Sequence, residues 1–360
     1  MTLTWHLLQF ALIMMVLVLV HEAGHMVVAK WCGMRVERFS IFFGRPIASF
    51  TRGETQYALG WLPLGGYVKI SGMTRDEEVP DEHLHRTYSR AATWRKVATI
   101  AAGPGVNILL AIVAFTCVFW LGVPGATVVR SIASVEKGGP AFNAGVRPGD
   151  RITAVDGVPV TTTEATRTAL LNRVGRTVPL TYRHGATTVT KPVTVRQPRG
   201  GCDPIGPIGV SFDLQETGIR HYGVLAGIRA GWSQSWFVVS ESTKQLGCVF
   251  QSSHARDQLQ SVVGVGAVYN EIAGQGIRTI LQFAAVLSLA LAIFNLIPLP
   301  PLDGGHIAFA LIERVRGRPL PRQVFERASI VGMALLLGLM VFTMQHDIIN
   351  IGNGTVLGPK

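Results

Sequence analysis

Four long apolar stretches constrain this sequence more than any other feature. They span residues 7–30, 97–123, 279–302 and 328–345. Each is long enough for a helix to cross a bilayer core of about 30 Å, which takes about 20 apolar residues. The composition agrees, since 48% of the residues are hydrophobic, 15% are charged and the mean hydropathy is +0.34. The sequence therefore predicts a multi-pass α-helical membrane protein with about four transmembrane helices.

Positive charge lies beside these stretches. The formal net charge is +11 at pH 7, and Lys and Arg cluster between the first and second stretches and between the third and fourth. Cytoplasmic loops carry such an excess, so we expect both loops in the cytoplasm and residues 125–276 and both termini outside. The basic residues form no stripe with stacking aromatics, which disfavours a nucleic-acid partner. The first stretch has no basic leader or cleavage site, so we expect it to stay attached.

The first polar segment has the pattern of short strands. Residues 36–72 alternate apolar and polar side chains between Gly- and Pro-containing turns at 44–46, 52–53 and 63–66. This pattern predicts a membrane-associated β-hairpin region within a first membrane core of residues 1–123. Residues 75–90 are polar, and we expect a loop that runs into a short helix.

The remaining polar residues predict a soluble domain and a connector. Residues 125–197 alternate short strands with turns and carry a helical pattern at 164–174, which predicts a small α+β domain. Residues 198–276 predict a connector whose amphipathic helix, at 222–250, lies in the membrane interface or docks on the soluble domain. A second membrane core, 277–347, and a tail, 348–360, complete the chain.

His21, Glu22 and His25 form an H-E-x-x-H motif in the first apolar stretch. On a helix, histidines four residues apart share one face and can both reach one zinc ion. Glu22 would then lie beside the metal, where a general base for the attacking water belongs. Ionisable groups at membrane depth are costly, which favours a functional site. The alternative is that the helix ends near Val20 and the motif begins a hydrated loop.

A catalytic zinc ion needs a third protein ligand and one open position. The best candidate is Asp303, because three prolines interrupt the third apolar stretch just before it, on the same membrane side as the motif. Prolines at membrane depth are tolerated where the chain is buried in protein or lines a polar cavity. His306 follows closely, but a fourth protein ligand would close the site to water. We expect it at a helix end or behind the ligands.

These motifs together resemble the site-2 protease family of intramembrane metalloproteases, and most of all its bacterial regulator-of-sigma-E protease branch. The resemblance pairs H-E-x-x-H with N-x-x-P-x-P-x-x-D-G, and two further segments agree with it. The matching positions are Asn295, Pro298, Pro300 and Asp303 in the third stretch, Gly103, Pro104 and Asn107 in the second, and Pro63 to Lys69 in the hairpin region.

The resemblance implies a zinc site and a reaction. It implies the ligands His21, His25 and Asp303, with Glu22 as the general base. It also implies that Asn295 and Asn107 contact the substrate backbone or the oxyanion; for Asn107, an interhelical hydrogen bond is the alternative.

The implied reaction cleaves peptide bonds within or next to the transmembrane segments of single-pass proteins, such as anti-sigma factors or signal-peptide remnants. The implied location is a bacterial plasma or inner membrane, with the site toward the cytoplasm. A helical substrate must unwind before cleavage, and we expect an edge strand at Tyr67, Val68 and Lys69 to hold it by strand addition.

The soluble domain resembles a bacterial PDZ domain. The resemblance rests on residues 140–157, which include Ala144-Gly145, Gly149-Asp150 and Val155-Asp156-Gly157. Such a domain offers a groove for a peptide strand, or it acts as a size filter above the site. The bacterial relatives carry two tandem PDZ domains, whereas one is readable here.

Two other classes of function compete with the protease. The competing class is a PDZ-bearing membrane scaffold or pseudo-protease that does not cut. A zinc transporter would need acidic or histidine groups in both membrane halves, and the second and fourth stretches supply none.

Cys202 and Cys248 both fall in the region expected outside, where disulfides persist. We expect them to be either bridged or two unpaired apolar cysteines.

Overall fold

The computed structural model describes residues 3–73, 79–197, 206–248 and 260–352. The chain divides into two compact units, and each is described by itself. The first comprises Met1–Val118, Leu225–Ser240 and Gln260–Val356. The second comprises Phe119–Val224, Glu241–Leu259 and Leu357–Lys360.

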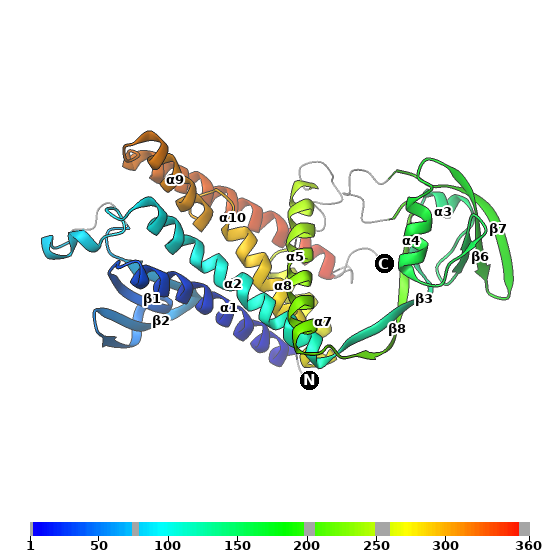
Figure 1. Ribbon diagram of the computed structural model, residues 1–360, viewed down its shortest axis with the longest axis horizontal. Coiled ribbons are helices and arrows are strands. Elements are labelled where there is room, and N and C mark those ends of the chain that lie inside the picture. The colour runs from blue at the N-terminus through cyan, green and yellow to red at the C-terminus, as the bar shows by residue number, and fades with distance from the viewer. Residues whose placement is uncertain (1–2, 74–78, 198–205, 249–259, 353–360) are drawn as a thin grey trace. The chain divides into compact units, whose positions relative to one another are not determined.

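The four predicted membrane spans are present as long helices (Figure 1). They are α1 (Leu3–Trp31), α2 (Thr93–Leu121), α8 (Ile277–Asn295) and α10 (Arg322–Gly352). Among the described residues, these helices are long and apolar enough to cross a membrane. Large apolar side chains such as Leu12, Leu109 and Leu335 are exposed on them, which suits contact with equally apolar lipid tails.

The third span ends earlier than predicted. α8 stops at Asn295 rather than near residue 302, and the chain turns through three prolines before α9 (Asp303–Arg316) begins. Proline lacks the amide hydrogen that a helix needs and restricts the residue before it, so a helix cannot continue through this segment. The length of the apolar stretch was therefore a wrong guide to the end of this helix.

Glycines let other segments pack closely on the turn before α9. A Cβ atom on Gly304 would collide with the carbonyl oxygen of Leu296. A Cβ atom on Gly332 of α10 would collide with the carbonyl oxygen of Pro300. The last long helix therefore lies directly against the turn that precedes Asp303.

Small residues also bring α1 and α2 together. A Cβ atom on Gly24 would lie 2.7 Å from the carbonyl oxygen of Ala102, closer than such contacts occur. Farther along α2, Phe115 packs with Leu289 of α8 in a fully buried cluster. Small residues commonly permit such backbone approach between membrane helices.

The predicted hairpin region is present, and its turns lie where they were predicted. β1 (Val36–Arg52) and β2 (Thr55–Ile70) pair antiparallel, and Phe39 of β1 pairs with both Tyr57 and Val68. β1 therefore lies between the two ends of β2, and residues 66–70 form an outer strand segment. The turns predicted at 44–46 and 63–66 are confirmed by the register. Residues 48–52 run antiparallel to 55–59, whereas residues 38–41 run parallel to 56–59 and antiparallel to 66–69, so the chain reverses direction between 41 and 48 and between 59 and 66. The short helix expected before the second span is the 3-10 helix η1 (Asp81–Arg86).

Two further helices pack on the spans. α5 (Val224–Cys248) occupies the predicted amphipathic segment, and its Gly231 packs against Thr116 of α2. Residues Leu225–Ser240 belong to the first unit, so this part of α5 docks on the membrane helices. α7 (Val262–Ile272), followed by the 3-10 helix η2 (Ala273–Gln275), was not predicted. Its Tyr269 packs against Phe10 of α1 and Phe283 of α8.

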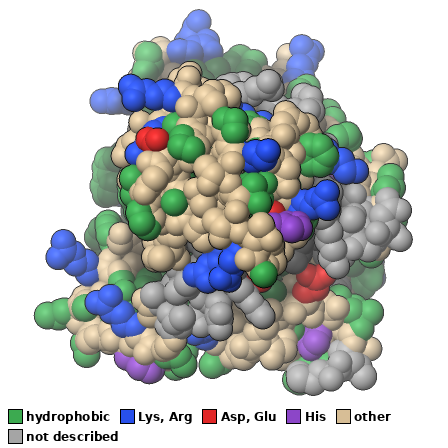
Figure 2. Space-filling view, turned by 90° about the vertical axis from the view of Figure 1, so that its right-hand side faces the viewer, with side chains coloured by type: hydrophobic (Ala, Val, Ile, Leu, Met, Phe, Trp, Pro, Cys, Tyr) green, Lys and Arg blue, Asp and Glu red, His purple; other side chains and the backbone are tan. Residues whose placement is uncertain are grey.

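The second unit contains two antiparallel sheets and two short helices. One sheet pairs β3 with β8, and the other has the order β5-β4-β6-β7. The elements are β3 (Val123–Val135), α3 (Pro140–Asn143), β4 (Arg151–Val155), β5 (Val158–Pro159), α4 (Thr163–Leu171), β6 (Thr177–His184), β7 (Thr187–Thr194) and β8 (Val210–Arg220). On the face shown in Figure 2, hydrophobic side chains are interspersed with Lys and Arg.

The local predictions for this unit are largely confirmed, but its end is not. A strand spans residues 151–155, and Asp156 and Gly157 have φ angles of 53° and 75°, as a tight Asp-Gly hairpin turn requires. Ile208 shares one buried core with Ile132 and Leu180, and β8 pairs with β3. The domain therefore continues beyond residue 197, where Gly and Pro suggested a connector.

The cysteines are only partly described. Cys32 and Cys117 are free thiols, and Cys248 is disulfide-bonded. Cys202 lies outside the described residues, so its part in the expected bridge stays a prediction.

A bidentate ion pair gives the first testable prediction. Arg86 donates to both carboxylate oxygens of Glu54, at 2.7 and 2.6 Å, and this contact lowers the pKa of Glu54 against a smaller opposing effect of burial. A lowered pKa stabilises the fold above the unfolded-state pKa of about 4.3, and the stabilisation is lost as pH falls through the folded-state value. We expect Glu54→Gln to reduce the free energy of unfolding by about 0.2–1 kcal/mol at pH 7 and to have no effect near pH 2.

Thermal unfolding in detergent at both pH values measures this difference. Glu82→Gln is the matched control, because the Glu82 side chain is 76% exposed and its ion-pair partner is a neighbouring histidine. An equal loss of stability by Glu54→Gln at both pH values would contradict the prediction.

Candidate metal centre

His21 and His25 lie on one face of α1, one turn apart. α1 continues to Trp31, so the motif is helical and the alternative of a hydrated loop from Val20 is excluded. Both side chains are buried, and their Nε2 atoms are 3.2 Å apart. A helix of this length thus presents two imidazoles side by side, as the four-residue spacing predicts.

Asp303 joins the two histidines from far along the sequence. It is the first residue of α9, and its Oδ2 atom lies 3.1 Å from His21 Nε2 and 3.3 Å from His25 Nε2. Within the described residues, these three side chains form the one group of His, Cys, Asp and Glu donors suited to a metal ion. The structure thus brings together all three residues expected to be ligands.

The three donor atoms fit a zinc ion. Zinc lies about 2.0–2.1 Å from nitrogen and oxygen ligands, which places neighbouring ligands of a tetrahedron about 3.3–3.4 Å apart. The observed separations are 3.1, 3.2 and 3.3 Å. Moreover, Asp303 Oδ2 is buried without a hydrogen-bond partner, although both nitrogens face it. Three lone pairs that converge in a buried site repel one another, and a cation between them relieves this repulsion.

Gly103 of α2 leaves the space that such an ion needs. A Cβ atom there would collide with His25 Nε2 and would lie 2.8 Å from His21 Nε2. In the sequence, Gly103 stands out only as part of a motif. Its role is apparent once α2 is seen to pass beside both imidazoles.

Backbone and side-chain groups of α2 hold the two rings from behind. His25 Nδ1 lies 2.9 Å from the carbonyl oxygen of Thr99, and a carbonyl can only accept, so His25 Nδ1 carries the proton and Nε2 has the free lone pair. His21 Nδ1 lies 3.2 Å from the side-chain amide of Asn107. The role of Thr99 was not predictable from the sequence, because a backbone carbonyl leaves no signature in the residue type.

Glu22 lies beside the hairpin rather than among the three donors. A Cβ atom on Gly66 would lie 3.4 Å from Glu22 Cγ, and the backbone amide of Val68 interacts with the Glu22 carboxylate. The carboxylate is therefore next to both the ligand group and the outer segment of β2. This is the location that a general base acting on a bound peptide requires.

Asn295 and His306 make other contacts. Asn295 donates its side-chain amide to the carbonyl of Leu291 on its own helix, at 3.0 Å. His306 packs its ring against Phe325, with centroids 5.1 Å apart. Neither belongs to the group of three donors.

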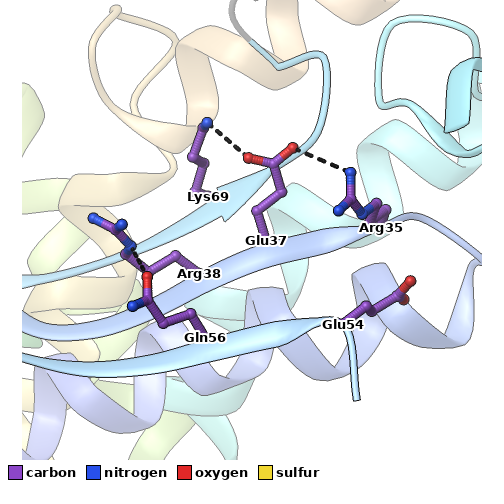
Figure 3. A pocket seen from close by; sticks show the side chains of 6 residues that line it. All are labelled: Arg35, Glu37, Arg38, Glu54, Gln56 and Lys69. Atoms are coloured by element: carbon purple, nitrogen blue, oxygen red, sulfur yellow. Dashed lines mark hydrogen bonds and ion pairs between the residues drawn. The ribbon is translucent and has the colours of Figure 1, made fainter. Parts of the chain in front are cut away.

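Tyr67 and Lys69 take part in polar contacts on the hairpin. Figure 3 shows the Lys69 side chain directed toward Glu37. Lys69 Nζ lies 2.7 Å and Arg35 Nη1 lies 3.8 Å from the Glu37 carboxylate. Burial raises the pKa of Glu37, but hydrogen bonds from Lys69 and Ser71 outweigh it and hold the pKa below its ordinary value. Arg38 donates to the Tyr67 hydroxyl at 3.2 Å. The network fixes these side chains and leaves the backbone edge between them beside Glu22.

The fold and the site define a helical membrane protein with an H-E-x-x-H metal centre completed by a distant aspartate. The sequence matches peptidase family M50 over residues 9–339, and the chain belongs to this family.

Several bacterial proteins are similar in sequence to this chain over nearly their whole length. "Putative zinc metalloprotease Atu1380" of Agrobacterium fabrum is 35% identical over 96% of both chains. "Putative zinc metalloprotease R01501" of Rhizobium meliloti is 34% identical over 94% of this chain and 95% of its own. "Putative zinc metalloprotease CPE1693" of Clostridium perfringens is 33% identical over 92% and 95%. The protein is therefore a membrane metalloprotease, and zinc is its cofactor.

Gly103 allows a direct test of the space around the metal. We expect Gly103→Ala to fold, because the colliding atoms are side-chain ends, but to bind zinc at least about tenfold more weakly, because the imidazoles must move apart. Gly105→Ala is the matched control on the same helix, since a Cβ atom there meets nothing within 4 Å. Metal analysis of both purified variants decides the matter, and normal zinc content in Gly103→Ala would refute the assigned position of the ion.

Proposed function

We propose that this protein is an intramembrane zinc endopeptidase of the site-2 type, with His21, His25 and Asp303 as ligands and Glu22 as the general base. The observation that carries the proposal is the triangle of donor atoms between α1, a membrane span, and the start of α9. A soluble metalloprotease has no need to place its ligands on a helix that crosses a bilayer, where polar groups are costly.

The residues of the site suffice for peptide hydrolysis. Bound zinc supplies the Lewis acidity that makes water a nucleophile near neutral pH. Glu22 accepts the proton of the attacking water as the new C–O bond forms. It then returns this proton to the amine as the peptide C–N bond breaks, so the carboxylate is regenerated. Asn295 is proposed to approach the oxyanion once its amide leaves the Leu291 carbonyl.

The outer segment of β2 is the proposed substrate holder. Residues 66–70 pair with β1 on one side, and the Val68 amide points to Glu22 on the other. A peptide added as a strand to this edge would pass directly beside the general base. Because the carbonyl groups of a transmembrane helix are bonded within the helix, the substrate must first unwind. Val68 would then exchange its contact with Glu22 for one with the peptide backbone.

The proposed substrates are single-pass membrane proteins, such as anti-sigma factors or signal-peptide remnants. The likeness to the regulator-of-sigma-E branch supports this class. The second unit, proposed as a single PDZ domain outside a bacterial plasma or inner membrane, would accept a peptide on a strand edge or exclude bulky ectodomains. The Asp-Gly turn after β4 and the helix α4 support the PDZ assignment. The basic charge of the loops proposed to be cytoplasmic supports the placement of this unit outside.

A non-catalytic scaffold or pseudo-protease is the alternative. It would keep the fold and the second unit, yet it has no physical reason to retain Glu22 beside three ligands. Incubation of the purified protein with a panel of single-pass membrane peptides, with and without a zinc chelator, separates the two. Chelator-sensitive cleavage supports the protease, and its absence across the panel supports the scaffold.

Glu22 and Asp303 should respond differently to substitution. We expect Glu22→Gln to keep fold and zinc and to reduce cleavage at least about 100-fold, because the amide fills the space without accepting a proton. Asp303→Ala should lose zinc as well as activity. Cleavage assays with parallel metal analysis test both, and near-normal cleavage by Glu22→Gln would make the mechanism wrong.

The strand edge can be tested through its backbone amide. Val68→Pro removes the donor that faces Glu22 and restricts the chain, so cleavage of helical substrates should fall at least about tenfold while zinc stays bound. Val68→Ala keeps the amide and serves as the control, with activity close to that of the unsubstituted protein. Equal activity of the two variants would remove strand addition from the mechanism.

A further inference from the structure

The side-chain amide of Asn107 is oriented so that its oxygen lacks a hydrogen-bond partner. The side chain is fully buried on α2, and its Nδ2 atom lies 3.2 Å from His21 Nδ1. Its Oδ1 atom is buried without a hydrogen-bond partner. An unpaired buried acceptor of this kind costs about 1–3 kcal/mol, so the arrangement calls for an explanation.

The ligand role of His21 decides which amide atom must face the ring. His21 Nε2 points to His25 Nε2 and Asp303 Oδ2, so zinc binding uses Nε2 and leaves the proton on Nδ1. An N–H group on the ring cannot pair with an NH₂ group. The amide oxygen and nitrogen of asparagine have nearly the same shape and are assigned from the hydrogen-bond network. Exchanging them places Oδ1, a good acceptor, against the His21 Nδ1 proton.

The same face of α2 also offers a hydrogen-bond acceptor to the second histidine. The Thr99 carbonyl accepts from His25 Nδ1 at 2.9 Å. Thr99, Gly103 and Asn107 follow one another at intervals of four residues, so they lie on one helix face. One end of this face accepts from His25, the middle leaves space for the ion, and the other end faces His21.

α8 holds Asn107 in place from the opposite side. The Ser288 hydroxyl donates to the Asn107 backbone carbonyl at 2.8 Å, and both residues are fully buried. The backbone at Asn107 is therefore fixed independently of its side chain. A rigid acceptor behind a metal-binding imidazole sets the tautomer and the direction of the ring.

We propose that Asn107 is a positioning residue for zinc, accepting a hydrogen bond from His21 Nδ1 through its side-chain oxygen. This role rests on the proposed ligand set and replaces the contact with substrate or oxyanion that the sequence suggested for Asn107. The buried amide acts through His21 and meets neither the substrate nor the ion.

Zinc affinity of the full-length variants in detergent, measured from the metal-free protein by competition with a chelator, tests this role. We expect Asn107→Leu, which has a similar size and no acceptor, to bind zinc about 10–100-fold more weakly. Asn107→Asp should bind as tightly as the unsubstituted protein or tighter, because a carboxylate can only accept. Gly105→Ala on the same helix is the matched control and should leave zinc affinity unchanged, because a Cβ atom there meets nothing within 4 Å.

The outcomes separate the possible roles. If Asn107→Asp loses zinc as strongly as Asn107→Leu, the residue acts as a donor and the proposal is wrong. Unchanged affinity in Asn107→Leu would show that the amide has no role in zinc binding. His21→Ala and Asp303→Ala, measured in parallel, report on the ligand set itself. If they retain full affinity, the ligand set fails, and the role of Asn107 fails with it.

Discussion

The contact between α1 and α2 is the constraint on which the rest of the structure depends. Gly24 and Gly103 let the two helices approach so closely that His21 and His25 lie between them instead of facing lipid. Burial removes water from the imidazoles, and α2 replaces it with acceptors behind the rings and space in front of them. A carboxylate from α9 then completes a triangle whose edges suit a tetrahedral ion. Each element of the site thus has a packing reason as well as a chemical one.

Much of this arrangement was predictable from the sequence, because strong local patterns encode it. The apolar stretches predicted the ends of the first two spans to within four residues and placed the fourth, whose helix extends six and seven residues beyond its predicted ends. The four-residue spacing predicted the shared face of His21 and His25. The third span was the exception. Apolar side chains at residues 296–302 lengthen the hydrophobic stretch, but backbone chemistry ends the helix at Asn295. Hydropathy measures side chains, whereas proline acts on the main chain.

The unpredicted parts depend on long-range pairing. Turn residues at 44–46 and 63–66 predicted where the chain reverses, but not that residues 38–41 pair with both ends of β2. α7 is a short apolar segment whose helix is buried by Phe10 and Phe283, residues far away in sequence. Thr99 contributes a carbonyl that any residue type would offer. Such roles become visible only when the neighbouring helix is in place, since the information lies in the contact rather than in the residue.

The packing of Gly332 against the carbonyl of Pro300 has a consequence for biosynthesis. During translation His21 and His25 leave the ribosome well before Asp303, and Asp303 leaves it before Gly332. The turn that carries Asp303 therefore lacks this packing partner until α10 has been made. A nascent chain that ends between the two would carry all three donor residues without the helix that packs against the turn. The order of these segments along the chain thus places the support of the third donor after the donor itself.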